Sequence, residues 1–79
     1  MDLVLDGDGA LYAQLARALK QAMASGRLPD GTRLPPSRDL ARDLGISRTT
    51  VVAAYEQLRT EGLLTGKVGA GSFLKRATR

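Results

Sequence analysis

Hydrophobic residues recur at helical spacing in the first third of the chain. From Ala10 to Ser25 they fall on one stripe, with polar residues on the opposite side, and this pattern predicts an amphipathic helix that ends before Gly26. The predicted apolar stripe consists of Leu11, Leu15, Ala18, Leu19, Ala22 and Met23, and the predicted polar face of Gln14, Arg17, Lys20 and Gln21. The apolar stripe is expected to face the core.

Two further helices are predicted in the middle of the chain, over residues 38–44 and from Arg48 to about Glu61, before Gly62. Each has an apolar stripe for the core. On the second helix the stripe is Leu40, Ala41 and Leu44; on the third it is Val51, Ala54 and Leu58, with Tyr55 at its edge. The other face of the third helix carries Arg48, Thr49, Val52, Ala53 and Glu56.

The boundary between these two helices is strongly marked. Ser37 follows two prolines and is a candidate N-cap, because its hydroxyl can accept a hydrogen bond from a free amide of the first turn. Gly45 is placed to end the second helix, since glycine adopts the left-handed conformation at little cost. Ser47 is a second candidate N-cap. The third helix would therefore start with Arg48 and the two threonines after it at an exposed tip, as in a helix-turn-helix.

Short strands are predicted around this unit. Residues 63–68 and 72–74 read as a β-hairpin around a glycine-rich tip, and residues 33–34 as a very short strand. The predicted fold class is mainly α with a small β-hairpin (α+β). Its architecture is a winged helix-turn-helix with three helices plus a wing.

The predicted domain organisation is simple. Residues 1–9 are expected to be a flexible lead-in, residues 10–75 the winged helix-turn-helix domain, and residues 76–79 a basic tail at the start of a linker.

Composition narrows the class of protein. The 79 residues suffice for one small domain, and the absence of cysteine excludes disulfides and thiolate metal sites. No apolar run approaches the roughly 20 residues of a membrane span, and the acidic first residues lack the basic region of a signal peptide. We therefore expect a cytoplasmic protein with no membrane partner.

Charge is distributed unevenly along the chain. Of the formal net charge of +4, residues 1–30 contribute −1 and residues 31–79 contribute +5, from nine basic and four acidic side chains. The excess lies in the part that holds the two-helix unit. This distribution suits a polyanionic partner, although a basic soluble surface explains the charge alone equally well.

Catalysis is disfavoured by the residue types present. The chain has no histidine or cysteine and no pair of carboxylates on a recognisable acid-base frame, so we expect neither an enzyme nor a metal site. The run from Gly66 to Ser72 superficially resembles a phosphate-binding loop. That loop requires a strand before it and a helix after it, whereas here a strand follows.

The ordered motifs resemble the N-terminal winged helix-turn-helix domain of GntR-type bacterial transcription regulators. They are G-x-L-P-x-G-x-x-L-P, S-R-x-L-A, G-x-S-R-x-T-V, L-x-x-E-G-L-L and G-x-G-x-F, and the resemblance covers residues 11–74. The segment A-Y-E-Q-L is similar to the MocR branch. That resemblance implies a further domain that binds pyridoxal phosphate in a longer parent protein; no cofactor is expected in this chain.

The resemblance implies double-stranded operator DNA as the partner. Helix 48–61 would enter the major groove, and the wing, residues 66–74, would lie on the backbone or in the minor groove. Arginine can bind a guanine edge or a phosphate, and threonine a phosphate or a thymine methyl group. The candidate DNA-binding residues are Ser37, Arg38, Ser47, Arg48, Thr49, Thr50, Val52, Lys67, Gly69 and Ala70. Some other GntR branches carry arginine at the position of Val52, so their base preference need not apply here.

The sequence leaves open an alternative function, and it bears on the oligomeric state. A winged helix can also serve as a protein-interaction module with little affinity for DNA. The resemblance implies a homodimeric parent, whereas the polar outer face predicted for the first helix offers no dimer seam, so the isolated chain is expected to be a monomer in dilute solution.

Overall fold

A computed structural model describes residues 3–67 and 71–75 of the chain. Its helices are α1 (Leu11–Ala24), α2 (Ser37–Leu44) and α3 (Arg48–Thr60). Its strands are β1 (Arg33–Leu34), β2 (Leu64–Lys67) and β3 (Gly71–Leu74). This is the predicted winged helix-turn-helix, with helix ends within one residue of the expected positions.

The three strands form one antiparallel sheet in the order β1-β3-β2. Arg33 pairs with Phe73, and Leu64 pairs with Leu74. Gly71, expected in the hairpin tip, lies instead in the first pair of β3, opposite Lys67. The predicted short strand therefore has a definite role, since it joins the connection before α2 to the wing.

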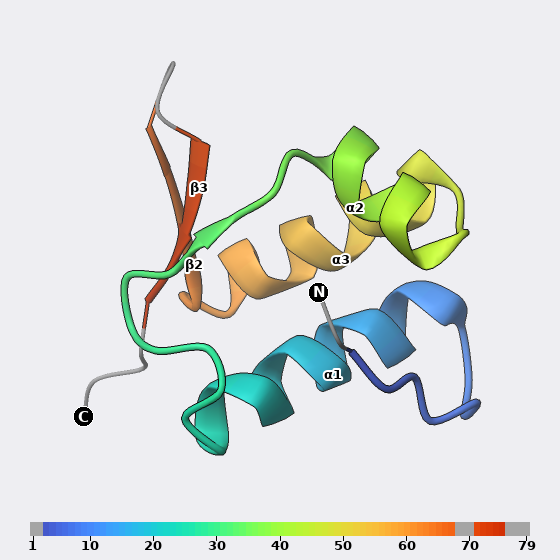
Figure 1. The fold of residues 1–79 in the computed structure, drawn as a ribbon, viewed down its shortest axis with the longest axis horizontal. Helices are drawn as coiled ribbons and strands as arrows, with labels where there is room; N and C mark the ends of the chain where they lie inside the picture. The colour runs from blue at the N-terminus through green and yellow to red at the C-terminus, as the bar shows by residue number, and fades with distance from the viewer. Residues whose placement is uncertain (1–2, 68–70, 76–79) are drawn as a thin grey trace.

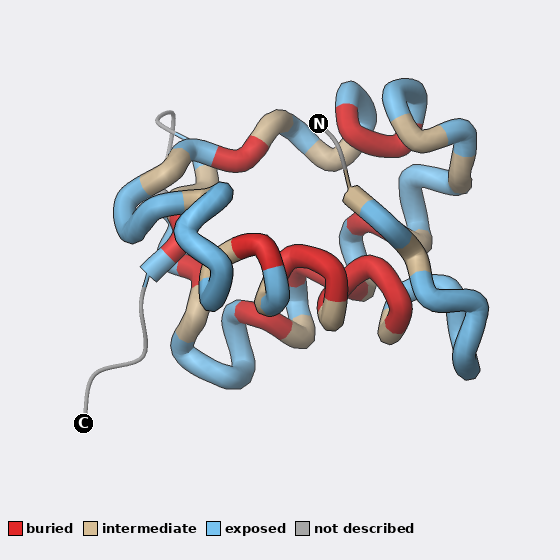
Figure 2. The backbone as a smooth tube through the Cα atoms, turned by 60° about the horizontal axis from the view of Figure 1, so that its bottom comes forward, coloured by how far each residue is buried: buried red, intermediate tan, exposed pale blue. Residues whose placement is uncertain are grey.

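The core lies where α1, α2 and the sheet meet α3 (Figure 1). Buried positions are concentrated in α1 and the inner face of α3, whereas residues 4–12 are mostly exposed (Figure 2). The fully buried large side chains are Leu15, Leu19, Leu34, Leu40, Val51, Leu58 and Leu74. The predicted inner face of α3, including Tyr55, is therefore confirmed.

The predicted faces of α1 need correction at two positions. Leu11 is 39% exposed, whereas Gln14, which we expected on the polar face, is only 9% exposed. Residues 3–9 fold back along the helix, and Gln14 holds them through a hydrogen bond accepted from Gly7 N (2.9 Å) and one donated to the Gly9 carbonyl (3.0 Å). A buried amide whose polar atoms are paired in this way is tolerated.

The lead-in makes further contacts with α1. Leu3 and Leu5 pack against the core, and Asp6 forms an ion pair with Arg17 at 2.8 Å. Arg17 also donates a hydrogen bond to the carbonyl of Asp8. The described part of the lead-in is thus attached to α1 along its length.

Candidate nucleic-acid interface

The start of α3 is built around Ser47. Its hydroxyl oxygen accepts a hydrogen bond from Thr50 N at 3.2 Å and lies 2.7 Å from the Thr50 hydroxyl, so the predicted N-cap is confirmed. Gly45, at φ 70°, ends α2 in the left-handed conformation. As a result, Arg48 and Thr49 form the first exposed turn of α3, while Thr50 is half-buried and its hydroxyl is already engaged.

The start of α2 differs from the prediction. Ser37 is the first helical residue and its side chain makes no capping hydrogen bond; Pro36 holds the N-cap position. The Pro36 carbonyl accepts hydrogen bonds from Asp39 N (2.9 Å) and Leu40 N (3.0 Å). A capping residue has extended geometry, and the second proline already supplies it with ψ at 148°. Ser37 therefore lies one position inside the helix.

Arg38 projects into solvent beside this helix start. Its side chain is 72% exposed, and its Nε lies 3.9 Å from Asp39 Oδ1, which also lies 3.7 Å from Arg42 Nη2. Ion pairs as exposed as these contribute at most about 1 kcal/mol. Arg38 can therefore leave its carboxylate partner for a phosphate at small cost.

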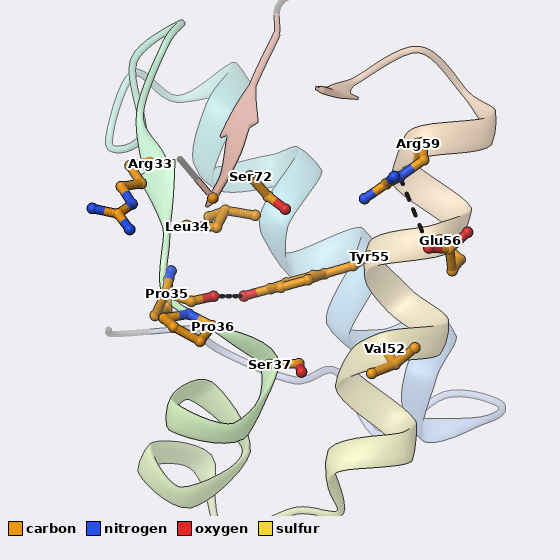
Figure 3. A pocket seen from close by; sticks show the side chains of 11 residues that line it. Arg33, Leu34, Pro35, Pro36, Ser37, Val52, Tyr55, Glu56, Arg59 and Ser72 are labelled. Carbon is orange, nitrogen blue, oxygen red and sulfur yellow. Dashed lines mark hydrogen bonds and ion pairs between the residues drawn. The ribbon is translucent and has the colours of Figure 1, made fainter. Parts of the chain in front are cut away.

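A cleft separates this two-helix unit from the wing. It is lined by α3, the connection from β1 to α2, and β3 (Figure 3). Ser37 and Val52 line it from α2 and α3, and Val52 is 41% exposed. The structure thus brings two of the predicted DNA-binding residues into one surface that continues to the wing.

Tyr55 fixes the floor of this cleft. Its hydroxyl donates a hydrogen bond of 2.7 Å to the Pro35 carbonyl and so joins α3 to the connection before α2 (Figure 3). Burial raises the pKa of the Tyr55 phenol above its ordinary value. This bond fixes the position of the start of α2 relative to the recognition helix.

Three charged residues that line the cleft were not among the predicted DNA-binding residues. They are Arg33, Glu56 and Arg59. Arg59 Nε lies 3.8 Å from Glu56 Oε1. The signal for Arg59 was present, because Arg48, Val52, Glu56 and Arg59 follow one another at spacings of four, four and three residues, which places them on one helical face. Arg33 carried no such signal, since its location depends on the pairing of β1 with β3.

The wing residues are described only in part. Lys67 ends β2 opposite Gly71. Gly69 and Ala70 lie outside the described residues, so their contribution stays a prediction. Within residues 3–67 and 71–75, no cluster of acidic side chains could hold a metal ion, and no helix is long and apolar enough to cross a membrane.

The fold and this surface define a winged helix-turn-helix domain. Residues 11–74 match the family model "Bacterial regulatory proteins, gntR family". The chain therefore belongs to the gntR family, and the predicted resemblance is confirmed.

Individual relatives agree with this assignment. The chain is 42% identical over 74 residues to the probable rhizopine catabolism regulatory protein MocR of Rhizobium meliloti, covering 91% of this chain and 15% of the relative. It is 48% identical over 66 residues to the HTH-type transcriptional regulator YdeL of Bacillus subtilis, covering 84% and 14%. Both relatives are named as regulators, and the chain spans only about one seventh of their length.

Solved structures show the same fold. YtrA from Sulfolobus acidocaldarius, a GntR-family transcription factor, superposes with a TM-score of 0.85 at 30% identity, covering 98% of this chain and 81% of that one. The N-terminal domain of AraR in complex with the ORR3 mutant superposes with a TM-score of 0.77 at 26% identity, covering 87% and 99%.

Proposed function

We propose that this chain is the operator-binding domain of a bacterial transcription regulator. The main observation that supports this proposal is the exposed first turn of α3, where Arg48 and Thr49 project from a helix that Ser47 caps. In a helix-turn-helix, this turn of the second helix reads base edges in the major groove. The regulators among the relatives, and the solved AraR–ORR3 complex, support the proposal.

The remaining contacts follow from the same docking. Arg38 and the amides at the start of α2 meet the phosphate backbone, and the wing lies along the backbone or the minor groove. Phosphate contacts would supply most of the affinity, and a few side chains on α3 the preference for sequence.

The regulator as a whole is a longer protein in this proposal. Because the chain spans about one seventh of the length of MocR and YdeL, we infer a further domain that pairs two copies, and for a MocR-like parent a domain that binds pyridoxal phosphate. The regulator would act on the chromosome in the cytoplasm.

The isolated chain is then a monomer that binds one half-site with micromolar affinity. Fusion to a dimeric partner should tighten binding to a two-half-site duplex at least tenfold. A stable dimer of the unfused chain in sedimentation would contradict this expectation.

The experiment for base reading is Arg48→Ala, measured on a duplex selected from a random pool and on a duplex of unrelated sequence. Loss of a bidentate contact to guanine weakens selected binding by about 1–3 kcal/mol, with a smaller loss on unrelated DNA. Lys20→Ala removes the same charge from α1 and should leave both affinities unchanged. An equal loss on both duplexes would show that Arg48 contacts only phosphate. No loss on either would contradict the docking, and a parent chain without duplex affinity would favour a protein-interaction module.

A further inference from the structure

The two glycines of β2 and β3 each lie against an arginine side chain. A Cβ atom at Gly66 would lie 3.4 Å from Arg59 Nη2, and one at Gly71 would lie 2.8 Å from Arg33 Nε. The second distance is shorter than real Cβ contacts allow, and Gly71 also has φ at +96°. Only glycine therefore permits the close approach of Arg33 at Gly71, whereas a Cβ at Gly66 would make an ordinary contact with Arg59.

The two arginines border the same cleft but approach the wing from opposite faces of its sheet. Gly66 pairs with Ser72 and Lys67 with Gly71, and successive residues of a strand point to opposite faces. Gly66 therefore faces α3 together with Ser72, whereas Gly71 faces the other side. Figure 3 shows Arg59 reaching from α3 toward the sheet and Arg33 at the far edge of β1, with Ser72 between them.

Both guanidinium groups are available to a ligand. Arg59 forms an exposed ion pair with Glu56 at 3.8 Å, and its side chain is 49% exposed. Arg33 is also exposed. An exposed ion pair such as Arg59–Glu56 contributes little to stability, so a phosphate can replace the carboxylate.

We propose that the wing straddles the minor groove, with Arg33 binding a phosphate of one strand and Arg59 a phosphate of the other. The inference rests on the proposed function, because it assumes that α3 occupies the adjacent major groove. The minor groove is about 6 Å wide and is bordered by two phosphate ridges. A thin hairpin with one guanidinium on each face meets both ridges, and the planar guanidinium suits bidentate binding of phosphate.

The first test is the salt dependence of binding to a 20-base-pair duplex of mixed sequence. Each phosphate contact contributes about −0.9 to the slope of log K against log salt concentration. Arg33→Gln and Arg59→Gln should each reduce the slope by about 0.9, and the double variant by about 1.8. The lysine variants at both positions should keep the slope, because the charge remains. Arg17→Gln, on α1, is the control of equal charge and should also keep it. If Arg33→Gln and Arg59→Gln keep the parent slope, this inference fails while the proposed function stands; if the parent chain binds no duplex, both fail.

The second test places the two contacts on the DNA. Neutral methylphosphonates are introduced one at a time into a duplex selected from a random pool. The parent chain should lose affinity at phosphates on both sides of one minor groove. Arg33→Gln should become insensitive to one side and Arg59→Gln to the other. Loss of sensitivity to the same side in both variants would overturn the straddling arrangement.

Discussion

Leu58→Ala tests the assignment of the faces of α3, on which every proposed DNA contact depends. Leu58 is 0% exposed and belongs to the core cluster shared by the three helices and the sheet. The substitution removes three carbon atoms from a fully enclosed site. At about 0.8 kcal/mol for each buried methylene group, the transfer contribution alone is roughly 2.4 kcal/mol.

The cavity left behind adds to this loss. Measured leucine-to-alanine changes in cores cost about 2–5 kcal/mol, and we expect a value near 3 kcal/mol here. For a domain of 60–100 residues, each kcal/mol lowers the thermal midpoint by about 4–8 °C. The midpoint should therefore fall by about 12–24 °C, measured by far-ultraviolet circular dichroism and checked by urea unfolding.

The control is Val52→Ala, on the same helix but 41% exposed. It should change the free energy of unfolding by no more than about 0.5 kcal/mol. Equal effects of the two substitutions, or an unchanged midpoint for Leu58→Ala, would show that the faces of α3 are assigned wrongly. The DNA contacts assigned to the outer face of α3 would then be wrong as well.

Three further predictions concern single contacts. Tyr55→Phe removes the hydrogen bond to the Pro35 carbonyl and should cost about 0.5–1.5 kcal/mol of stability in urea unfolding; an unchanged free energy would show that the bond contributes nothing. Glu56→Gln removes a negative charge from the cleft and should tighten duplex binding at low salt, an effect that high salt removes; weaker binding would contradict the position of the DNA. The hydrogen bond from Arg17 lowers the pKa of Asp6 to about 2, so the stability from this group is present above pH 4 and is lost as the pH falls toward 2. Asp6→Asn should therefore flatten the decline of the thermal midpoint over that range, and an identical pH profile in the variant would contradict the interaction.

The sequence predicted most of the fold because its signals are local. The stripe of Val51, Ala54 and Leu58 identifies the inner face of α3 by spacing alone, and Gly45 marks the end of α2 by its freedom to take positive φ. Both depend on residues within a few positions of each other. The same holds for the N-cap at Ser47.

The errors arose where distant residues or neighbouring prolines decide the outcome. Gln14 is buried because the lead-in folds back over α1, which helical periodicity cannot indicate. Ser37 lost its capping role because Pro36 already holds the extended conformation that a cap requires. Arg33 lies at the candidate site because β1 pairs with β3, and a pairing between distant residues is not visible in the local sequence.

Titration of the isotopically labelled chain with a selected duplex, followed by the chemical shifts of its backbone amides, tests directly whether α3 docks on DNA. At 8.4 kDa the chain suits this measurement well. We expect the largest changes at residues 37–38, 47–52 and 71–72, with none on the outer face of α1 around Arg17 and Lys20. Changes centred on α1, or no changes at any DNA concentration, would contradict this docking.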